Sequence, residues 1–507
     1  MSRVTSRCND YSWSIDLIVL RDRIVSSNAA VVLVLAGLAG ALRLVNLGQE
    51  SLWYDEAFTA WLARLPFGAM MAAVRGDVHP PLWYVIEWGI VHLFGDSAFA
   101  LRFPAAILSC VAVVLVWQLA RASGLKARPA ILAGVLAGVL PAALYYGQDA
   151  RMYPLLACFV LGAALAAINE NWLAFILCGA GAAYTQNLGL FYVLALLEVC
   201  TLLAVFDKRP VHWPILAGIG IFLLWLPWSP NFFHQAGAVA HGFWIPPLTI
   251  GTALFPLGEM TAGFRFPPTL VLFMFGPTVA LSLAGFWAVR RWARSRAGMI
   301  VFSVILGAPA LIALASVLFV SVYLPRALLP SALALMIVWA VALTHLAEPD
   351  RRVAQVVIGA VLVLGLYSHY WPGVAARAPF ASWANVIARA WQPGDVVYHL
   401  GIDSAVSFGY YLPGRAAVLL PEAGDLTQAL SDETKAAMGF VSAPFDSLAG
   451  RGYRRAWLIM ATGPLTSQLE IEALDKIWRQ YNARPVFTVA ETATTLTIYL
   501  IDLPVQL

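Results

Sequence analysis

The 507-residue sequence has little charge for its length, because Asp, Glu, Lys and Arg together make up only 12% of the residues. Soluble domains carry about 25% charged residues. Apolar residues make up 61% of the chain, and its mean hydropathy is +0.76. A single soluble core stops growing beyond about 250–300 residues and cannot bury this much apolar surface. The composition therefore excludes an ordinary soluble protein and predicts a polytopic α-helical membrane protein.

Cysteines and basic runs are also scarce. The net charge is only +4, and no basic run alternates with aromatic residues, so a nucleic-acid partner is not expected. Four of the five cysteines fall in apolar stretches, and their spacing fits neither a disulfide framework nor a metal knuckle. We interpret them as small apolar side chains. They are Cys8, Cys110, Cys158, Cys178 and Cys200.

Eleven apolar stretches approach the length of about 20 residues that a bilayer requires. The polar residues 1–27 precede the first of them, and no cleavage site for a signal peptide follows it. We therefore predict a retained, cytoplasmic N-terminal arm. The expected spans are 28–46, 101–120, 129–147, 151–168, 172–188, 189–206, 213–230, 269–289, 299–320, 327–346 and 354–373.

Residues 80–95 are the ambiguous stretch, since they are short for a span and contain Glu87 and His92. We interpret them as an interfacial helix within a large external loop, 46–100. With this choice most loop Lys and Arg residues lie on the side of the N-terminus, as the positive-inside rule requires. The prediction is eleven spans over residues 28–376, with up to 13 left open, in the plasma (inner) membrane of the cell.

The sequence becomes more polar after residue 376 and contains no further stretch of spanning length. Residues 383–391 have a helical pattern, and the Pro393-Gly394 turn separates them from an expected strand at 396–400. Further strands are expected at 456–460 and 495–501. Residues 377–507 are thus predicted to form a small extracytoplasmic α/β domain.

Acidic, basic and aromatic residues gather in the first two external loops. A lone carboxylate at such a place is usually a solvated interface residue. Asp55 differs because aromatic residues precede it and an apolar stretch follows it, so we expect partial burial. Burial raises the pKa of a carboxylate and nearby arginines lower it, which is how a general base is tuned. The residues are Trp53-Tyr54-Asp55-Glu56-Ala57, Asp77-Val78-His79-Pro80-Pro81, Leu101-Arg102-Phe103-Pro104 and Tyr146-Gly147-Gln148-Asp149-Ala150-Arg151-Met152-Tyr153-Pro154.

This order of motifs resembles the GT-C membrane glycosyltransferases, in particular the protein O-mannosyltransferase and ArnT-like superfamily (glycosyltransferase family 39). The resemblance covers about residues 28–350 and implies a GT-C type fold. It departs at Arg326, which Ala327 follows where relatives often have Tyr, and at Gln186, where relatives often have His. Such enzymes move a sugar from a polyprenyl-phosphate carrier to an acceptor and invert the anomeric carbon.

The resemblance also implies roles for single residues. Asp55 matches the catalytic base and Glu56 its partner acid. Asp149 matches the acidic position of the second loop, which holds the acceptor, a metal or an arginine. A divalent metal is left open, with Asp55, His79 and Asp149 as candidate ligands.

The leaving group of such a reaction is an anionic lipid phosphate, so cationic side chains are expected to stabilise it. Arginine grips phosphate oxygens with two parallel hydrogen bonds. His79 is alternatively a helix-start residue, and Arg102 is alternatively an arginine that snorkels at the end of a span. The candidates for binding carrier phosphate or substrate are His79, Arg102, Arg151, Tyr146 and Arg326.

We therefore expect an inverting glycosyltransferase that transfers a hexosyl or pentosyl group to a lipid, glycan or protein on the extracytoplasmic face. The main alternative is a polytopic transporter or flippase of lipid-linked sugars without transferase activity. A transporter commonly has charges near the midplane of the membrane and repeated halves. Here the charges gather on one face and no internal repeat is visible.

Overall fold

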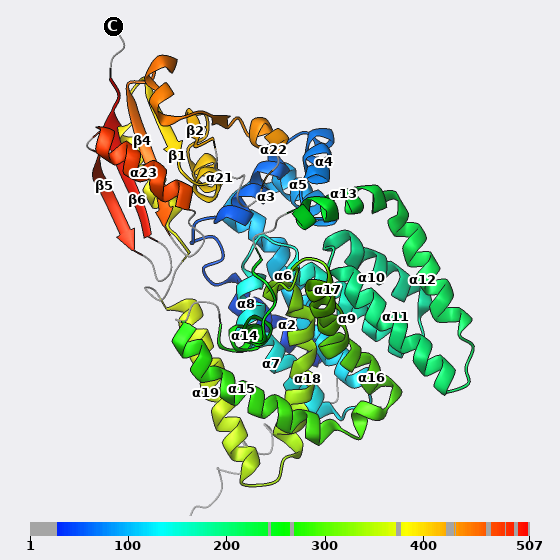
Figure 1. Cartoon of the computed structure of the whole chain (residues 1–507). Coiled ribbons are helices and arrows are strands. Elements are labelled where there is room, and N and C mark those ends of the chain that lie inside the picture. Colours follow the sequence, from blue (N-terminus) through cyan, green and yellow to red (C-terminus); the bar gives the residue numbers. More distant parts are fainter. Residues whose placement is uncertain are drawn as a thin grey trace, which may run out of the picture.

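The computed structural model describes residues 28–241, 245–263, 268–371, 377–421, 430, 432–462, 468–481, 483–490 and 495–504. The predicted arm, residues 1–27, lies outside these ranges. The chain forms a helical part and a sheet domain at one end of it (Figure 1). This confirms the fold class of a polytopic helical protein with a small C-terminal α/β domain.

Every one of the eleven predicted spans is helical in the described residues. Several are interrupted by short 3-10, π or bent segments, often at a proline. The elements are α2 (Asn28–Leu44), α6 (Ala98–Ala122), α7 (Ala127–Val139) with α8 (Pro141–Gly147), α9 (Tyr153–Ile168), α10 (Trp172–Thr185), α11 (Gly189–Phe206), α12 (His212–Trp225) with η1 (Leu226–Trp228) and α13 (Ser229–His241), α15 (Pro268–Val289), α16 (Arg296–Phe302) with η3 (Ser303–Gly307) and α17 (Ala308–Leu318), η4 (Pro325–Leu328) with α18 (Leu329–His345), and α19 (Asp350–Tyr370). The connection between α15 and α16 contains η2 (Trp292–Arg294).

By length and composition, six helical segments of the described chain can cross a membrane, or seven if the pair α7 and α8, bent by 54°, counts as one span. Other apolar helices, such as α2, α9 and α10, have 10–17 residues. The total of eleven spans therefore stays a prediction.

Burial separates central helices from peripheral ones. In the segment Pro325–His345, which contains α18, 94% of the most apolar window is buried inside the protein, compared with 22% in the segment that begins with α12. The buried Trp339 of α18 donates from Nε1 to the Ser282 hydroxyl at 3.1 Å, which satisfies its polar atom within the bundle. The exposed leucines and phenylalanines of α12 fit contact with lipid tails.

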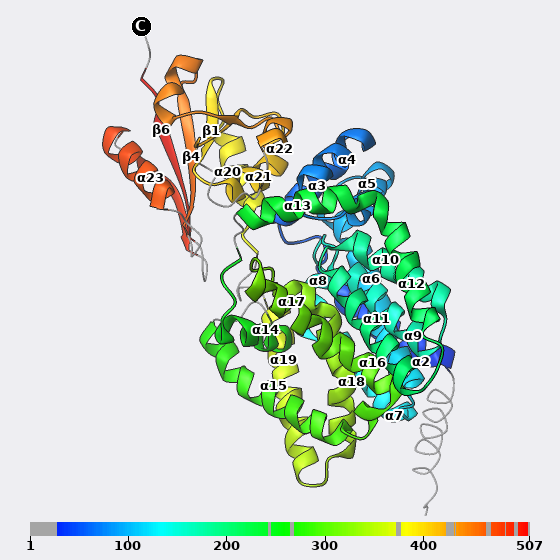
Figure 2. The same cartoon turned by 45° about the vertical axis from the view of Figure 1, so that its right-hand side comes forward.

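Three short helices form the long loop between α2 and α6. They are α3 (Tyr54–Arg64), α4 (Phe67–Gly76) and α5 (Leu82–Phe94). Prolines separate them: Pro66 precedes α4, and Pro80-Pro81 precedes α5. The ambiguous stretch 80–95 is thus a 13-residue helix that ends at Gly95, whose φ of 79° suits glycine. The loop helices lie beside the sheet domain, at the same end of the helical part, with α13 next to them (Figure 2).

The C-terminal domain is built around a six-stranded sheet in the order β3-β2-β1-β4-β6-β5. Strands β1 to β4 run parallel to one another, whereas β6 is antiparallel to β4 and to β5. The elements are α20 (Phe380–Ala390), β1 (Asp395–His399), α21 (Ile402–Tyr411), β2 (Ala417–Leu419), α22 (Asp432–Ala437), β3 (Val441–Ser442), η5 (Phe445–Ser447), η6 (Ala449–Arg451), β4 (Arg455–Thr462), α23 (Gln468–Tyr481), β5 (Arg484–Ala490) and β6 (Thr495–Asp502).

The predicted helix at 383–391 corresponds to α20, and the three predicted strands correspond to β1, β4 and β6. These strands are central, and their apolar patterns are correspondingly strong. Three strands were not predicted. The strands β2 and β3 have only three and two residues, whereas β5 has seven and was missed as well.

The sheet domain docks on the loop helices through backbone groups. The Leu52 N–H donates to the Tyr411 hydroxyl at 2.6 Å, and the Ala381 N–H donates to the Ser51 hydroxyl at 3.1 Å. The Tyr410 hydroxyl donates to the Asp96 carbonyl at 2.7 Å. These contacts flank α3, so the sheet domain helps to fix the position of that helix.

A buried carboxylate stabilises the sheet domain, and its removal should be costly. Asp395 accepts from the Arg455 guanidinium at 2.7 and 2.8 Å, from Trp457 Nε1 at 2.9 Å and from the Gln392 N–H at 2.9 Å. We expect Asp395→Ala to reduce the stability of the domain by about 3 kcal/mol, because buried donors lose their partner. Limited proteolysis of the purified full chain against temperature measures the loss.

The matched control is Asp446→Ala, which removes an exposed carboxylate that pairs with Lys476. An exposed pair contributes at most about 1 kcal/mol. Equal proteolysis profiles for the two variants would contradict the structural role of Asp395.

Candidate active site

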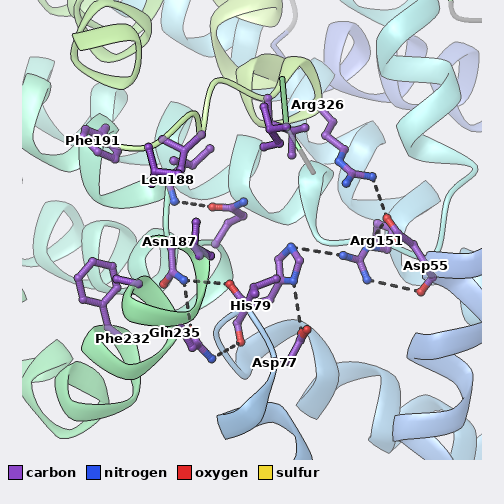
Figure 3. A pocket seen from close by; sticks show the side chains of 18 of the residues that line it. Asp55, Asp77, His79, Arg151, Asn187, Leu188, Phe191, Phe232, Gln235 and Arg326 are labelled. Atoms are coloured by element: carbon purple, nitrogen blue, oxygen red, sulfur yellow. Dashed lines mark hydrogen bonds and ion pairs between the residues drawn. The ribbon is translucent and has the colours of Figure 1, made fainter. Parts of the chain in front are cut away.

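A cavity of about 270 Å³ lies where the loop helices meet the helical part (Figure 3). Charged and polar side chains from distant segments line one part of it, and apolar side chains line another. The charged residues come from α3, the segment before α5, the α8–α9 loop and η4, so only the tertiary fold brings them together. The polar lining residues considered below are Asp55, Asp77, His79, Arg151, Asn187, Gln235 and Arg326.

Asp55, the second residue of α3, is the central carboxylate of this cavity. Its Oδ2 accepts a hydrogen bond from Arg326 at 2.8 Å and lies 3.7 Å from Arg151 Nε. Burial alone would raise the pKa of Asp55, but the two arginines outweigh burial and hold the pKa below its ordinary value. The carboxylate is therefore ionised at neutral pH and able to accept a proton.

His79 links a second carboxylate to Arg151. Its Nδ1 lies 3.3 Å from Asp77 Oδ2, and its Nε2 lies 3.4 Å from the Arg151 guanidinium. Burial lowers the pKa of His79, although Asp77 opposes the shift, so we assign a neutral ring. In that state Nδ1–H donates to Asp77 and Nε2 accepts from Arg151, the tautomer that satisfies both partners. The Tyr84 hydroxyl also donates to Asp77 at 2.9 Å.

Two amide side chains attach α13 to the His79 segment. Gln235 of α13 donates to the carbonyls of Val74 at 3.1 Å and His79 at 3.3 Å. Asn187 donates to the Val78 carbonyl at 3.0 Å and to Gln235 Oε1 at 3.2 Å. The wall around His79 is therefore held by side chains of the helical part (Figure 3).

The remaining wall of the cavity is apolar. Phe191 of α11, Phe232 of α13 and Phe319 after α17 belong to it. Phe319 is 85% exposed, so the cavity reaches the outer surface of the helical part there. An amphipathic molecule can accordingly place a charged group near Asp55 and an apolar chain along these helices.

A second cavity of about 620 Å³ adjoins the first. Both are lined by Ile245, Leu324 and Arg326, so Arg326 lies between them. Tyr146 lines the second cavity, as does Glu259 of α14 (Ile250–Ala262). The guanidinium that bonds to Asp55 is thus accessible from two sides.

Glu56, next to Asp55, does not line either cavity and is fully buried. It accepts from Arg102 at 2.7 Å with both oxygens and from Arg377 at 2.6 Å. Burial alone would raise the pKa of Glu56, but Arg102 and Arg377 lower it to about 2. Glu56 Oε1 also accepts from the Ala150 N–H at 2.9 Å, which joins the first loop to the second.

Asp149 is fully buried beside this pair. Trp53 Nε1 donates to its Oδ1 at 2.8 Å, and the Arg377 guanidinium lies 3.4 Å away. Its Oδ2 has no hydrogen-bond partner among the described residues. Burial raises the pKa of Asp149 to about 7, although Arg377 opposes the shift. We call Glu56, Arg102, Asp149 and Arg377 the buried ion cluster.

The structure thus divides the predicted site residues into two groups. Asp55, His79, Arg151 and Arg326 line the first cavity, and Tyr146 lines the second. Glu56, Arg102 and Asp149 line neither and lie in the buried ion cluster.

The expectation that Arg102 binds phosphate does not fit this geometry. Besides Glu56, its guanidinium donates to the carbonyls of Leu47, Glu50 and Ser51 at 2.9–3.0 Å. Its charge and donors are therefore already used inside the protein, and its side chain is only 2% exposed.

The candidate metal ligands Asp55, His79 and Asp149 do not converge. Within the described ranges no group of three His, Cys, Asp or Glu side chains is arranged to hold a metal ion. Asp55 faces two arginines, which disfavour a dication at that carboxylate. These residues do not fit a metal site, and the chemistry below uses none.

Several residues of the site were not assigned from the sequence. Asp77 lies two residues before His79 in a motif that was identified, so its spacing was an available signal. Asn187 and Gln235 act through contacts between distant segments, and Arg377 lies beyond the last motif. For these three the sequence alone contains no recognisable signal.

Comparisons with known proteins agree with this architecture. The sequence model of the dolichyl-phosphate-mannose-protein mannosyltransferase family matches residues 78–232. No curated protein matches the chain by sequence. The solved structure of apo ArnT from Cupriavidus metallidurans is 16% identical, with a TM-score of 0.61 and coverage of 96% of this chain and 98% of that chain.

Two further structures extend the comparison. ArnT from C. metallidurans bound to undecaprenyl phosphate is 15% identical, with a TM-score of 0.61 and coverage of 92% and 97% of the two chains. The apo oligosaccharyltransferase of Archaeoglobus fulgidus is 12% identical, with a TM-score of 0.55 and coverage of 86% of this chain and 69% of that chain. The resemblance predicted from the motifs is thus confirmed: the chain has the fold of the GT-C glycosyltransferases and is similar to their protein mannosyltransferase and ArnT-like members.

Proposed function

We propose that this protein is an inverting glycosyltransferase that moves a hexosyl or pentosyl group from a polyprenyl-phosphate carrier to an acceptor on the extracytoplasmic face of the membrane. The observation that carries the proposal is the first cavity, where an ionised carboxylate and two arginines lie at one end of an apolar surface. Asp55 is the base in this proposal, and Arg326 and Arg151 bind the carrier phosphate.

The reaction follows from these groups. Asp55 takes the proton of the acceptor hydroxyl or amine as its oxygen or nitrogen attacks the anomeric carbon of the sugar. The bond between this carbon and the phosphate oxygen breaks, and the oxygen leaves with the electron pair. Because nucleophile and leaving group lie on opposite sides of the carbon, one displacement inverts it. The departing phosphate needs cations rather than a proton, and Arg326 and Arg151 supply them.

Arg326 connects donor binding to base strength. In the structure its guanidinium bonds to Asp55 at 2.8 Å and helps to lower the pKa of that carboxyl. A phosphate with its own negative charge competes for the same guanidinium. As Arg326 moves its hydrogen bonds to the phosphate, the Asp55 carboxylate loses a stabilising cation and becomes a stronger base. The base would thus be activated when the donor is present.

The apolar wall supports a lipid carrier. Phe191, Phe232 and Phe319 extend from the charged end of the first cavity to the exposed surface of the helical part. The similar ArnT structure bound to undecaprenyl phosphate is in agreement with this class of carrier. We place the acceptor, whether lipid, glycan or protein, in the second cavity, which also reaches Arg326.

The position of the site agrees with the orientation inferred from the basic residues. The loop helices α3, α4 and α5 lie at the same end of the helical part as the sheet domain (Figure 1). Asp55 belongs to α3, and His79 lies between α4 and α5. The proposed topology has the N-terminus in the cytoplasm and this side outside, in the plasma (inner) membrane. The donor and acceptor then meet on the outer face.

Substitution of Asp55 tests the base. We expect Asp55→Asn to reduce sugar transfer by a factor of about 100 or more, within the range for a lost general base, because the amide has the same shape but cannot take the proton. Purified protein in liposomes is incubated with a panel of radiolabelled polyprenyl-phosphate sugars and membrane extract, and the labelled product is counted.

Asp96→Asn is the matched control, since Asp96 is a more exposed carboxylate that pairs with Arg64 outside the cavities. It should transfer sugar at the wild-type rate. Full transfer by Asp55→Asn would contradict the assignment. Movement of labelled carrier across the bilayer without any transfer would support a flippase instead.

A pair of arginine substitutions tests the division between cavity and buried cluster. We expect Arg326→Met to raise the KM for the donor by about 10-fold or more, since a charge-assisted phosphate contact is lost. Arg102→Met should instead destabilise the protein by about 3–5 kcal/mol, because Glu56 keeps its buried charge with fewer partners.

Thermal unfolding of both variants and donor kinetics of the folded fraction provide the measurements. Arg209→Met is the control for stability, because Arg209 is an exposed residue that pairs with Glu170. If folded Arg102→Met has a raised KM for the donor and Arg326→Met has an unchanged KM, then Arg102 binds the phosphate and Arg326 does not, contrary to the proposal.

A further inference from the structure

Glu259 is a carboxylate in the second cavity without a role in the chemistry above. It lies on α14, which begins at Thr249 with a capping box to Thr252 and ends at Gly263, where φ is 101°. Thr252, Phe255, Pro256 and Glu259 recur at the spacing of one helix face, and all four line the cavity. The helix therefore presents Glu259 to the same space that Arg326 reaches.

No hydrogen bond or ion pair engages the Glu259 side chain among the described residues. The side chain is half-buried in the wall of the cavity, and this burial raises its pKa to about 7. The hydroxyl groups nearby have other partners: Ser321 donates to the Pro246 carbonyl at 2.6 Å, and Tyr323 donates to the Ala253 carbonyl at 3.3 Å. Within the described part of the chain, Glu259 is thus an acidic group of this cavity without a partner of its own.

A carboxylate in such surroundings reduces stability unless something binds to it. The half-buried Glu259 carboxylate loses hydration that no protein hydrogen bond replaces, and an apolar side chain of similar size would avoid that loss. The surrounding side chains, such as Phe255, Pro256 and Leu248, would pack well against an apolar residue. Binding of a ligand that donates a hydrogen bond to Glu259 would explain why a carboxylate occupies this position.

The position favours an acceptor over the donor. The cations that fit a carrier phosphate, Arg151 and Arg326, line the first cavity, and only Arg326 reaches the second. Near the second cavity Ile250 is 82% exposed, which places an apolar surface beside a polar group. This combination suits an amphipathic molecule with a hydrogen-bonding head.

We propose that Glu259 is a specificity-determining residue, which accepts a hydrogen bond from a hydroxyl or ammonium group of an amphipathic acceptor bound in the second cavity. The assignment of this ligand as the acceptor rests on the proposed transferase function. The hydrogen bond itself requires no reaction, so binding can be measured separately from turnover.

The experiment measures equilibrium binding of two matched probes to the purified full chain in lipid nanodiscs without donor. Octyl glucoside has only hydroxyl groups, whereas octyl 2-amino-2-deoxyglucoside replaces one of them by an ammonium. Titration calorimetry at pH 8, where Glu259 is mostly ionised, gives the Kd of each probe. The variants are Glu259→Leu, Glu259→Gln and, as a control on the same helix, Leu254→Ala, which alters an exposed residue outside the cavity lining.

We expect Glu259→Leu to weaken binding of the preferred probe by about 10-fold or more, as for a lost hydrogen bond to a charged group. Leu254→Ala should bind as the wild type does. If the wild type prefers the amino sugar and Glu259→Gln loses binding, the group that donates is an ammonium. If Glu259→Gln retains binding and binds both probes equally, the group that donates is a hydroxyl, because the amide carbonyl of Gln still accepts its hydrogen bond.

The proposal is overturned if the wild type binds neither probe or if Glu259→Leu binds both with unchanged Kd. Misfolding is checked by thermal unfolding, where Glu259→Leu should match or exceed the wild type because a half-buried carboxylate is replaced by an apolar side chain. If the probes bind through Glu259 but no donor is consumed, the site stands and the transferase function fails. If donor is consumed and Glu259 does not affect binding, the transferase stands and this site fails.

Discussion

The ion pairs around Glu56 are the interaction on which the site depends. A fully buried carboxylate is stable only because Arg102 and Arg377 both bond to it, and removal of either leaves an uncompensated charge inside the protein. Through Glu56 Oε1 the same group holds the Ala150 N–H, so the first and second loops are fixed to each other. Arg377 comes from the chain that leads into the sheet domain. The buried ion cluster therefore joins three parts of the chain at one point.

Two of the proposed functional residues, Asp55 and Arg151, are neighbours of this cluster in sequence. Asp55 precedes Glu56 on α3, and Arg151 follows Ala150, so fixing one pair places the other. The two groups of residues differ in how their charges are compensated. The Glu56 carboxylate, which accepts from two arginines and from the Ala150 N–H, is inside the protein, whereas Asp55 and Arg326 share a hydrogen bond that a phosphate can compete for. An ion pair at the wall of a cavity can exchange its hydrogen bond for one to a charged ligand, as a binding site for such a ligand requires.

The sequence predicted the fold class and the gathering of Asp55, His79, Arg151 and Arg326, because composition, apolar runs and ordered motifs are local signals. From the sequence, Arg102 was wrongly expected to bind phosphate. The spacing of motifs shows which residues lie near a loop, but it does not show which partners a side chain bonds to. Arg102 bonds to carbonyls of residues 47–51, a contact that depends on how the loop folds back over α6. Arg377 and Glu259 have no motif around them, and their importance arises only from residues distant in sequence.

The sheet domain acts on the site through α3. Its Tyr411 hydroxyl and the Ala381 N–H bond to Leu52 and Ser51, which directly precede that helix, and Tyr410 bonds to Asp96 at the end of the same long loop. The buried ion cluster holds α3 itself through the bonds of Glu56. A displacement of a reacting group by about 1 Å can reduce a rate by about 100-fold. Because Asp55 is only the second residue of α3, its position depends on both attachments. In the proposed reaction the small domain therefore helps to position the base.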